Sequence, residues 1–272
     1  MTVALPDVNS DLEVARELAE AARAVALKYF RSDALQIGNK RAADGTFDPV
    51  TVADKEVEAV IRTILSERRP FDGVLGEEHD NTAGTSGRTW VIDPIDGTRA
   101  FMCGLPTWGV LIALNDGSQP IIGVMDQPYT GERYIAVCTD YLMTSLCQRG
   151  EREVRLQTRT GRSLSDAVLC STAPDAFPTD DEFARFSALA SQTRLTRYGT
   201  DCYGYAMLAR GQIDLVVESG LKPYDIQAMI PIVQAAGGFV TNWQGGDCQD
   251  GGQVIAAANA GVHAAALEVL SG

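Results

Sequence analysis

Residues 90–98 read Trp-Val-Ile-Asp-Pro-Ile-Asp-Gly-Thr, and they constrain the fold more than any other part of the chain. The three apolar residues predict the end of a buried strand. Pro94 lacks an N–H and fixes its own φ, so the chain is expected to leave the strand sharply after Asp93. Asp93 and Asp96 should then converge at the carboxyl end of the strand, where open α/β sheets place their ligand sites.

The same run predicts a chemistry. Asp93 and Asp96 offer hard oxygen ligands, which suit Mg²⁺ or Mn²⁺ rather than zinc. Gly97 lets the backbone approach a ligand closely, and Thr98 adds a hydroxyl beside free amides that can hold a phosphate. A strand followed by an acidic turn is the ordinary alternative, but two acids, a glycine and a threonine in register favour a metal and phosphate site.

Composition excludes several classes of partner. The 272 residues carry a formal net charge of −13, which argues against a nucleic-acid or anionic-membrane surface. A small phosphorylated substrate stays compatible, because a bound metal reverses the local field.

The six cysteines are scattered without a C-x-x-C pair, as in reduced cytoplasmic proteins. No signal peptide or membrane-spanning run is evident, and a cytoplasmic location is expected.

The first part of the chain combines two helices with a run of strands. Helical periodicity predicts helices over residues 11–30 and 53–68, and the polar segment 31–48 between them predicts a loop or hairpin. Short apolar runs without intervening helices then predict an antiparallel sheet. These runs cover residues 74–75, 89–92, 108–114, 121–126, 133–137 and part of 141–160.

The second part alternates strands and helices, which predicts a more parallel, layered α/β arrangement. The expected strands cover residues 168–171, 195–198, 215–218 and 253–258, and the expected helices cover 180–192, 203–209, 223–236 and 262–270. Two fused sublobes are therefore predicted, residues 1–160 and 161–272, with the site in the cleft between them.

Three further acids stand out. Glu77 follows the short strand near residue 75, and Asp225 lies in the first turn of a predicted helix, where the dipole favours an anion. Asp54 lies at the start of the second helix, three residues after Thr51. Each has an ordinary alternative: a turn acid for Glu77, a plain helix-start residue for Asp225, and a capping box for Thr51 with Asp54. None of the three is decisive alone.

In this order, however, the motifs resemble the signatures of the inositol monophosphatase family. The resemblance runs from about residue 10 to the end of the chain. It rests on Asp93-Pro94-Ile95-Asp96-Gly97-Thr98, on Gly76-Glu77-Glu78, on Thr51 with Asp54, and on Tyr224-Asp225-Ile226-Gln227-Ala228 followed by Gly237-Gly238. The chain departs from the family pattern in two places. Tyr224 replaces the usual Trp, and Arg99-Ala100-Phe101 stands where inositol phosphatases tend to have Thr-Asn-Phe.

The resemblance implies a fold and a set of roles. The fold would be an αβαβα sandwich, with an antiparallel sheet in the N-terminal sublobe and a mixed or parallel sheet in the C-terminal one. Two or three Mg²⁺ ions are expected, with Mn²⁺ possible in their place, and a homodimer is a family expectation. The implied metal ligands are Glu77, Asp93, the Ile95 carbonyl, Asp96 and Asp225.

The remaining implied roles concern the phosphate and the attacking water. The Gly97 and Thr98 amides would receive phosphate oxygens, with Asp96 and Asp225 also facing the substrate. Thr98 and Asp54, together with Glu77, would orient a water molecule or take its proton. Hydrolysis would proceed by direct attack of metal-activated water, without a phosphoenzyme.

Residues 197–203 and 217–225, with Asp-Gly-Thr-Arg-Ala-Phe, resemble the histidinol-phosphate phosphatase branch of the family. L-histidinol phosphate carries an amine and an imidazole, both cationic when protonated. Asp201 and Glu218 are expected to contact these groups, and Arg197 to position the substrate or its phosphate. The alternative is that Asp201 caps a helix and that Glu218 is only a strand-end acid.

The predicted function is therefore Mg²⁺-dependent hydrolysis of L-histidinol phosphate to L-histidinol and phosphate, a step of histidine biosynthesis. An inositol 1-phosphatase or a 3′-phosphonucleotide phosphatase of the same family is the alternative within enzymes. A regulatory RNA- or protein-binding member is the alternative outside them. The net charge and the complete set of acids argue against that last reading.

Overall fold

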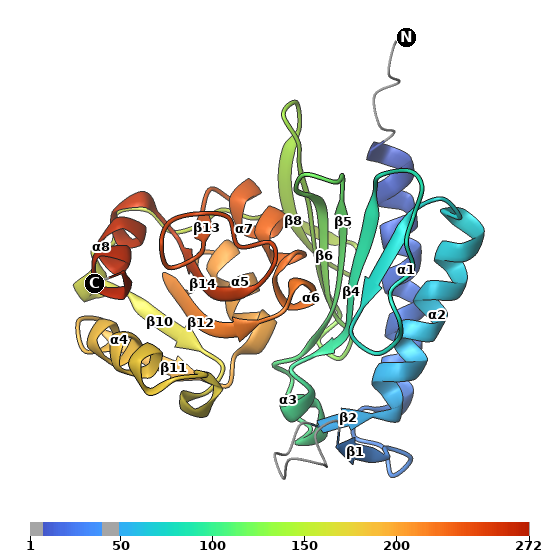
Figure 1. Cartoon of the computed structure of the whole chain (residues 1–272), viewed down its shortest axis with the longest axis horizontal. Coiled ribbons are helices and arrows are strands. Elements are labelled where there is room, and N and C mark those ends of the chain that lie inside the picture. The colour runs from blue at the N-terminus through green and yellow to red at the C-terminus, as the bar shows by residue number, and fades with distance from the viewer. Residues whose placement is uncertain (1–7, 40–48, 272) are drawn as a thin grey trace.

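The two larger β-sheets of the described chain alternate with three layers of helices across the molecule (Figure 1). The structure is a computed structural model that describes residues 8–39 and 49–271. A pair of long helices covers one sheet, three shorter helices lie between the two sheets, and two helices cover the outer face of the second sheet. The expected αβαβα sandwich is confirmed.

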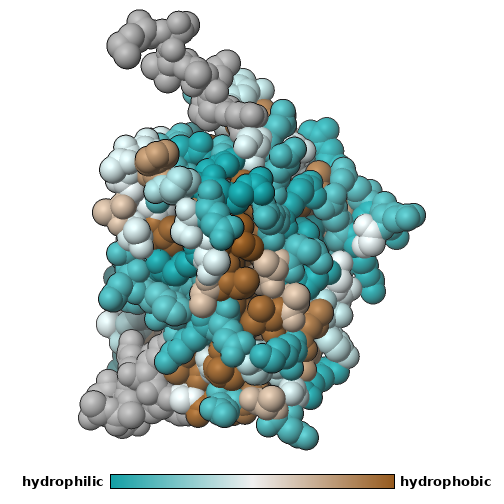
Figure 2. Space-filling view, turned by 90° about the vertical axis from the view of Figure 1, so that its right-hand side faces the viewer, coloured by the Kyte–Doolittle hydropathy of each residue, from teal (hydrophilic) through white to brown (hydrophobic). Residues whose placement is uncertain are grey.

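The first helical layer consists of α1 (Val8–Tyr29) and α2 (Val52–Arg68), close to the ranges that periodicity predicts. Each turns an apolar stripe toward the sheet, with Leu18 of α1 and Ile61 of α2 fully buried. Their outer face is mainly hydrophilic, with hydrophobic residues gathered in a band down its middle and lower part (Figure 2). No described helix is both long enough and apolar enough to cross a membrane.

The polar segment between these helices contains a small antiparallel pair, β1 (Ile37–Asn39) with β2 (Pro49–Thr51). This agrees with the predicted loop or hairpin as far as it can be compared, since residues 40–48 lie outside the described residues. Strand β2 leads directly into α2. Thr51 is the N-cap of α2, and Thr51 and Asp54 form a reciprocal capping box.

The larger sheet has seven strands in simple sequence order. All neighbours are antiparallel except β3 and β4, which are parallel. The antiparallel prediction therefore holds from β4 onward. The strands are β3 (Gly73–Gly76), β4 (Thr89–Asp96), β5 (Gly109–Asn115), β6 (Pro120–Gln127), β7 (Glu132–Cys138), β8 (Met143–Arg149) and β9 (Arg152–Arg155).

Strand β4 corrects one prediction, because it does not end at Asp93 but continues to Asp96. Its pairing with β5 steps from Asp93 opposite Leu111 to Asp96 opposite Gly109, so three steps on β4 face two on β5. The extra residue forms a bulge, and Pro94 lies within it. A bulge tolerates a residue without an N–H, whereas a regular ladder position does not.

The smaller sheet has five strands in the order β11-β10-β12-β14-β13. Strand β10 is parallel to both neighbours, and β14 is antiparallel to both of its own, so the predicted mixed sheet is confirmed. The short strand β13 was not predicted. The strands are β10 (Val168–Ser171), β11 (Leu195–Tyr198), β12 (Leu215–Leu221), β13 (Phe239–Thr241) and β14 (Gly252–Ala257).

Helices α5 (Asp201–Ala209), α6 (Pro223–Ile226) and α7 (Met229–Ala235) lie between the sheets, while α4 (Asp180–Ala190) and α8 (Ala260–Leu270) lie outside. The single helix predicted over residues 223–236 is wrong, since α6 and α7 are separate. Pro231 lacks the N–H that would bond the Gln227 carbonyl in a continuous helix, so the helix breaks there. A short helix after β4, α3 (Thr98–Met102), was also not predicted.

Candidate metal and substrate site

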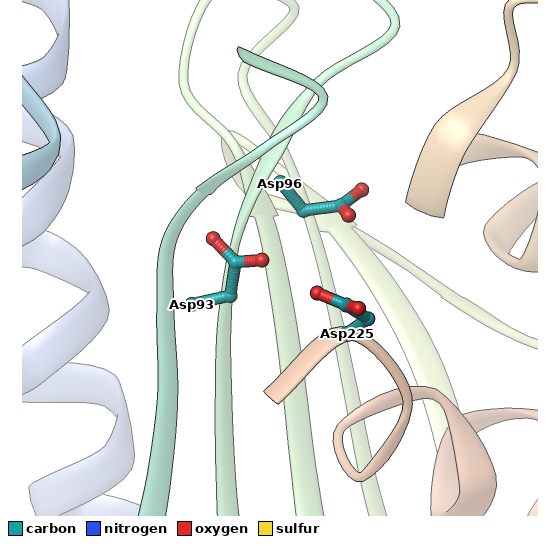
Figure 3. A group of neighbouring side chains, drawn as sticks. All are labelled: Asp93, Asp96 and Asp225. Carbon is teal, nitrogen blue, oxygen red and sulfur yellow. The ribbon is translucent and has the colours of Figure 1, made fainter. Parts of the chain in front are cut away.

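Three aspartates from two distant parts of the chain meet beside the last residues of β4 in the larger sheet. Asp93 and Asp96 lie on β4, and Asp225 lies on α6. One carboxylate oxygen of each lies within 4.8 Å of those of the other two. Figure 3 shows their side chains gathered around a common space between the strand and the helix. The sequence predicts that Asp93 and Asp96 converge, the family resemblance adds Asp225, and the structure brings all three together.

A backbone amide orients each of these carboxylates. Asp93 Oδ1 accepts the Ile95 N–H at 3.0 Å, and Asp96 Oδ2 accepts the Cys202 N–H at 2.7 Å. Asp225 Oδ2 accepts the N–H of the helix N-cap residue, Lys222, at 2.6 Å. Each carboxylate therefore keeps a second oxygen that its amide does not use.

The cluster is electrostatically unfavourable without a cation. Burial, and then the neighbouring carboxylates, raise the pKa of Asp93 well above its ordinary value. Burial raises the pKa of Asp96 to about 8 and that of Asp225 to about 7, with further contributions from nearby acids. Within residues 8–39 and 49–271, no lysine or arginine forms an ion pair with any of the three. Asp93 is buried and Asp96 and Asp225 are half-buried, and an all-oxygen donor set of this kind fits a hard divalent cation.

Glu77 lies beside this cluster, at the end of β3. It is not one of the three converging carboxylates, but after burial its charge is the largest cause of the raised pKa of Asp93. The turn that carries it depends on Glu58 of α2. A Cβ on Gly76 would lie 2.2 Å from Glu58 Oε1, and Glu58 Oε2 accepts the Glu78 N–H at 2.7 Å. The sequence did not predict this role of Glu58, because no local pattern shows that an acid on a helix contacts a turn far along the chain.

Asp54 and Thr98 lie close together, although 44 positions separate them in the chain. Thr98 Oγ1 is 3.4 Å from Asp54 Oδ1 and donates to the Ile95 carbonyl at 3.1 Å. The other oxygen of Asp54 accepts the Thr51 N–H at 2.8 Å. Asp54 therefore forms the capping box with Thr51, and its carboxylate also contacts the Thr98 hydroxyl.

Gly97 is the N-cap of α3 and has φ +82°. An added Cβ would lie 2.8 Å from the Thr107 carbonyl oxygen, so both conformation and space require glycine here. This turn directs the chain from the bulge of β4 into α3 and places Thr98 beside the carboxylates. The phosphate-binding role of the Gly97 and Thr98 amides stays a prediction.

A cavity of about 260 Å³ adjoins the aspartate cluster. Both Asp201 and Glu218, the two acids predicted to contact the substrate, lie in its wall. Its lining residues are Asp96, Arg99, Ser171, Thr172, Ala176, Phe177, Asp201, Glu218, Ser219, Gly220, Leu221 and Asp225.

Asp201 is the first residue of α5 and has φ +44°, which is rare for a residue with a side chain. Thr200 is the N-cap of this helix, so the alternative that Asp201 is its cap does not hold. Burial and then the charge of Glu218 raise the pKa of Asp201 to about 7, whereas Arg99 lowers it. A strained residue with a perturbed carboxylate in a cavity wall is typical of a binding site.

Glu218 is only 6% exposed. Its Oε1 accepts the Thr172 hydroxyl at 2.5 Å, and its Oε2 accepts the Tyr205 hydroxyl at 3.0 Å. Burial raises its pKa, while these hydrogen bonds lower it. Glu218 is therefore an oriented group in the cavity wall and not a solvated acid at the end of a strand.

Arg197, Asp201 and Glu218 are the three residues predicted to distinguish the substrate, and of these only Arg197 is absent from the cavity lining. Its side chain is exposed on β11, an edge strand, where it pairs in register with Cys170. Arg99, directly after Thr98, lines the cavity instead and lies 3.5 Å from Asp175. The only sign in the sequence that Arg99 is a site residue is that it stands where inositol phosphatases tend to have threonine.

Comparison with known proteins agrees with this geometry. The model of the inositol monophosphatase family matches residues 7–271. The chain is 37% identical to the bifunctional phosphatase IMPL2 of Arabidopsis thaliana, over 97% of this chain and 78% of the relative. It is 35% identical to a histidinol-phosphatase of Chlorobaculum parvum, over 93% of each chain.

Among solved structures, an inositol monophosphatase from Zymomonas mobilis superposes with a TM-score of 0.82 and 35% identity, covering 98% of this chain and 100% of that one. The family match, the shared fold and the gathered carboxylates agree with one another. The chain therefore belongs to the inositol monophosphatase family and is a metal-dependent phosphatase.

Proposed function

We propose that this phosphatase hydrolyses L-histidinol phosphate to L-histidinol and phosphate, with Mg²⁺ as its metal. One observation carries the choice of substrate. Asp201 and Glu218 lie in the wall of the cavity that adjoins the aspartate cluster, and Arg99 is the only lysine or arginine among the described lining residues. A wall with more acids than bases suits an ester whose far end bears an amine and an imidazole. The histidinol-phosphatase among the relatives supports the same choice.

The proposed metal ligands are Glu77, Asp93, the Ile95 carbonyl, Asp96 and Asp225, and two or three Mg²⁺ ions, or Mn²⁺, would occupy them. When bound, such ions lower the pKa of water and neutralise charge on a transferred phosphoryl group. Asp93, Asp96 and Asp225 supply negative charge that no described lysine or arginine neutralises by an ion pair.

The chain's own residues orient the reactants. Asp54 Oδ1 lies within reach of Thr98 Oγ1, so a water molecule held by this hydroxyl can pass a proton to Asp54. Glu77 is the second candidate to accept that proton. The Gly97 and Thr98 amides begin α3 and are proposed to bind phosphate oxygens, with Asp96 and Asp225 beside them.

Inositol 1-phosphate is the second candidate substrate, because the solved inositol monophosphatase from Zymomonas mobilis is equally similar in sequence. Its hydroxyls can also donate to carboxylates, but they would leave the charge of Asp201 and Glu218 uncompensated. A nucleotide is less well suited, since Phe177 is the only aromatic residue among the described lining residues. A homodimer and a cytoplasmic location stay predictions.

Phosphate release from L-histidinol phosphate, inositol 1-phosphate and phosphoadenosine phosphate, each with Mg²⁺ and with EDTA, tests the proposal. We expect activity only with metal. We also expect kcat/KM to favour histidinol phosphate by about a hundredfold, or about 2.7 kcal/mol of transition-state discrimination. A flat or inositol-favouring profile would reject the proposed substrate and keep the phosphatase class.

A further inference from the structure

The carboxylate of Glu218 accepts two hydrogen bonds from two different parts of the smaller lobe of the fold. Thr172 follows β10 and donates to Oε1, while Tyr205 lies within α5 and donates to Oε2. Thr172 lines the cavity. Tyr205 does not line it and is only 1% exposed, so it supports Glu218 from behind the cavity wall.

These two donors fix how Glu218 is presented. Because each oxygen has its own donor, rotation of the carboxylate about its terminal bond would weaken both hydrogen bonds. An ionised carboxylate has about four acceptor positions, of which Thr172 and Tyr205 use two. Burial raises the pKa of Tyr205 well above its ordinary value, so its hydroxyl keeps its proton and stays a donor. The remaining positions of the Glu218 carboxylate can only accept hydrogen bonds, so they suit a ligand group that donates them.

Asp201 reinforces this preference for a donor. It lines the same cavity, and Glu218 is close enough to raise the pKa of the Asp201 carboxyl. Arg99 is more than half exposed and already lies 3.5 Å from Asp175. Besides Asp96 and Asp225 of the aspartate cluster, the described cavity lining therefore has two further carboxylates and no buried cation.

We propose that Tyr205, with Thr172, is a positioning residue that holds Glu218 as a preorganised acceptor for the cationic end of the substrate. By holding Glu218 in this orientation, Tyr205 favours phosphate esters that bear an amine over esters that have no cationic group. The inference rests on the proposed function and adds to it a residue outside the cavity. Tyr205 contacts neither substrate nor metal and acts only through Glu218.

Tyr205→Phe removes the donor and keeps the buried ring. Glu218 would then be less firmly oriented toward the cationic end of the substrate, so we expect KM for L-histidinol phosphate to rise about tenfold. The kcat value should stay within about twofold, because the interaction is made equally in the ground and transition states. The kcat/KM value for p-nitrophenyl phosphate, which has no cation, should not change.

Tyr134→Phe is the matched control, since Tyr134 of β7 is also a fully buried tyrosine and does not line the cavity. It should leave both substrates unaffected. Thr172→Val provides a second loss of a donor should Tyr205→Phe fold poorly, and Thr172→Ser, which keeps the hydroxyl, should restore the wild-type KM.

A double-mutant cycle with Glu218→Gln separates this inference from the proposed function. If Tyr205 acts through Glu218, Tyr205→Phe should change KM by less than about twofold in the Glu218→Gln background. The cycle is measured on whichever of the two biological esters, histidinol or inositol phosphate, the wild-type enzyme turns over better. Equal losses on that ester and on p-nitrophenyl phosphate, or additive effects in the cycle, would overturn the role of Tyr205. A wild-type preference for inositol phosphate would overturn the proposed function instead.

Discussion

At the scale of single residues, the site is defined by charge that the described protein groups do not neutralise. Asp93 is 2% exposed, and its nearest charged neighbours are other acids. Removing one partner of a buried charge pair is costly, and a cluster of like charges is costlier still. These residues therefore lower the stability of the metal-free protein and contribute to function only with a cation.

Asp93→Asn tests this assignment. Asparagine keeps an oxygen that can accept the Ile95 N–H but removes one negative charge from the cluster. We expect turnover with Mg²⁺ to fall by about a thousandfold. The thermal midpoint in EDTA should equal or exceed that of the wild type, because repulsion is relieved. Turnover at the wild-type rate would contradict the metal assignment.

At the scale of elements, two irregularities build the site. The bulge in β4 separates Asp93 from Asp96, and the break between α6 and α7 leaves Asp225 on its own short helix. The strands and long helices around them follow from local periodicity, with the bounds displaced by a few residues. Hydrophobic periodicity does not show the irregularities. The bulge depends on the partner strand that β4 meets, whereas the helix break follows from Pro231, a local signal that periodicity does not register.

The close approach of this helix break to the larger sheet depends on Gly123 of β6. A Cβ there would lie 2.1 Å from the Ala228 carbonyl oxygen, between α6 and α7. Gly123→Ala should lower the free energy of unfolding by about 1–3 kcal/mol, as overpacking does. It should also weaken Mg²⁺ activation, because α6 carries Asp225.

Denaturant unfolding and a Mg²⁺ titration of activity measure both effects. Gly261→Ala in α8 is the comparison, since the nearest atom to its added Cβ is a side-chain oxygen at 3.3 Å. Its stability should change by less than about 1 kcal/mol. Similar behaviour of the two variants would show that the backbone approach at Gly123 is not critical.

At the scale of the whole molecule, a metal at this site connects the two halves of the chain. Asp93 and Asp96 belong to the larger sheet, whereas Asp225 follows the last residues of β12 in the smaller sheet. Binding free energy at such a site is also folding free energy. The stability of the molecule should therefore depend on both metal and pH.

In EDTA, the pKa values of about 8 for Asp96 and about 7 for Asp225 lie above those of the unfolded chain, near 4. Between about pH 4 and pH 8 the folded state keeps protons that the unfolded state has released. Stability should thus fall as the pH rises through this window and level off above it. Thermal unfolding from pH 5 to pH 9 measures this, and Asp93→Asn should show a shallower dependence.

Mg²⁺ should reverse that loss at alkaline pH. At a concentration a hundred times its Kd, it should add about 2.7 kcal/mol of stability, which corresponds to a rise in Tm of about 5–10 °C. The rise should be smaller at pH 5, where protons compete for the same oxygens. An equal Mg²⁺ shift at both pH values would argue that the ion binds elsewhere.

The sequence by itself determined the acids, their order and the regular elements that carry them. Asp93 and Asp96 could be identified because the end of a buried strand is a local signal, readable from apolar residues and turn residues. Local signals made Glu77 and Asp225 candidates, and the resemblance of the motifs to the family gave them their roles. The layered fold could be predicted for the same reason. The motif spacing then identified the family.

Only the tertiary structure decided which residues face the cavity. Arg197 and Arg99 are both arginines near predicted site segments, yet the first is exposed on an edge strand and the second lines the cavity. Glu58 and Tyr205 gain their roles from partners 20 and 13 positions away. Such choices depend on strand register and on how two sheets pack around α5 and α6. They are set by contacts between distant segments, which no local pattern encodes.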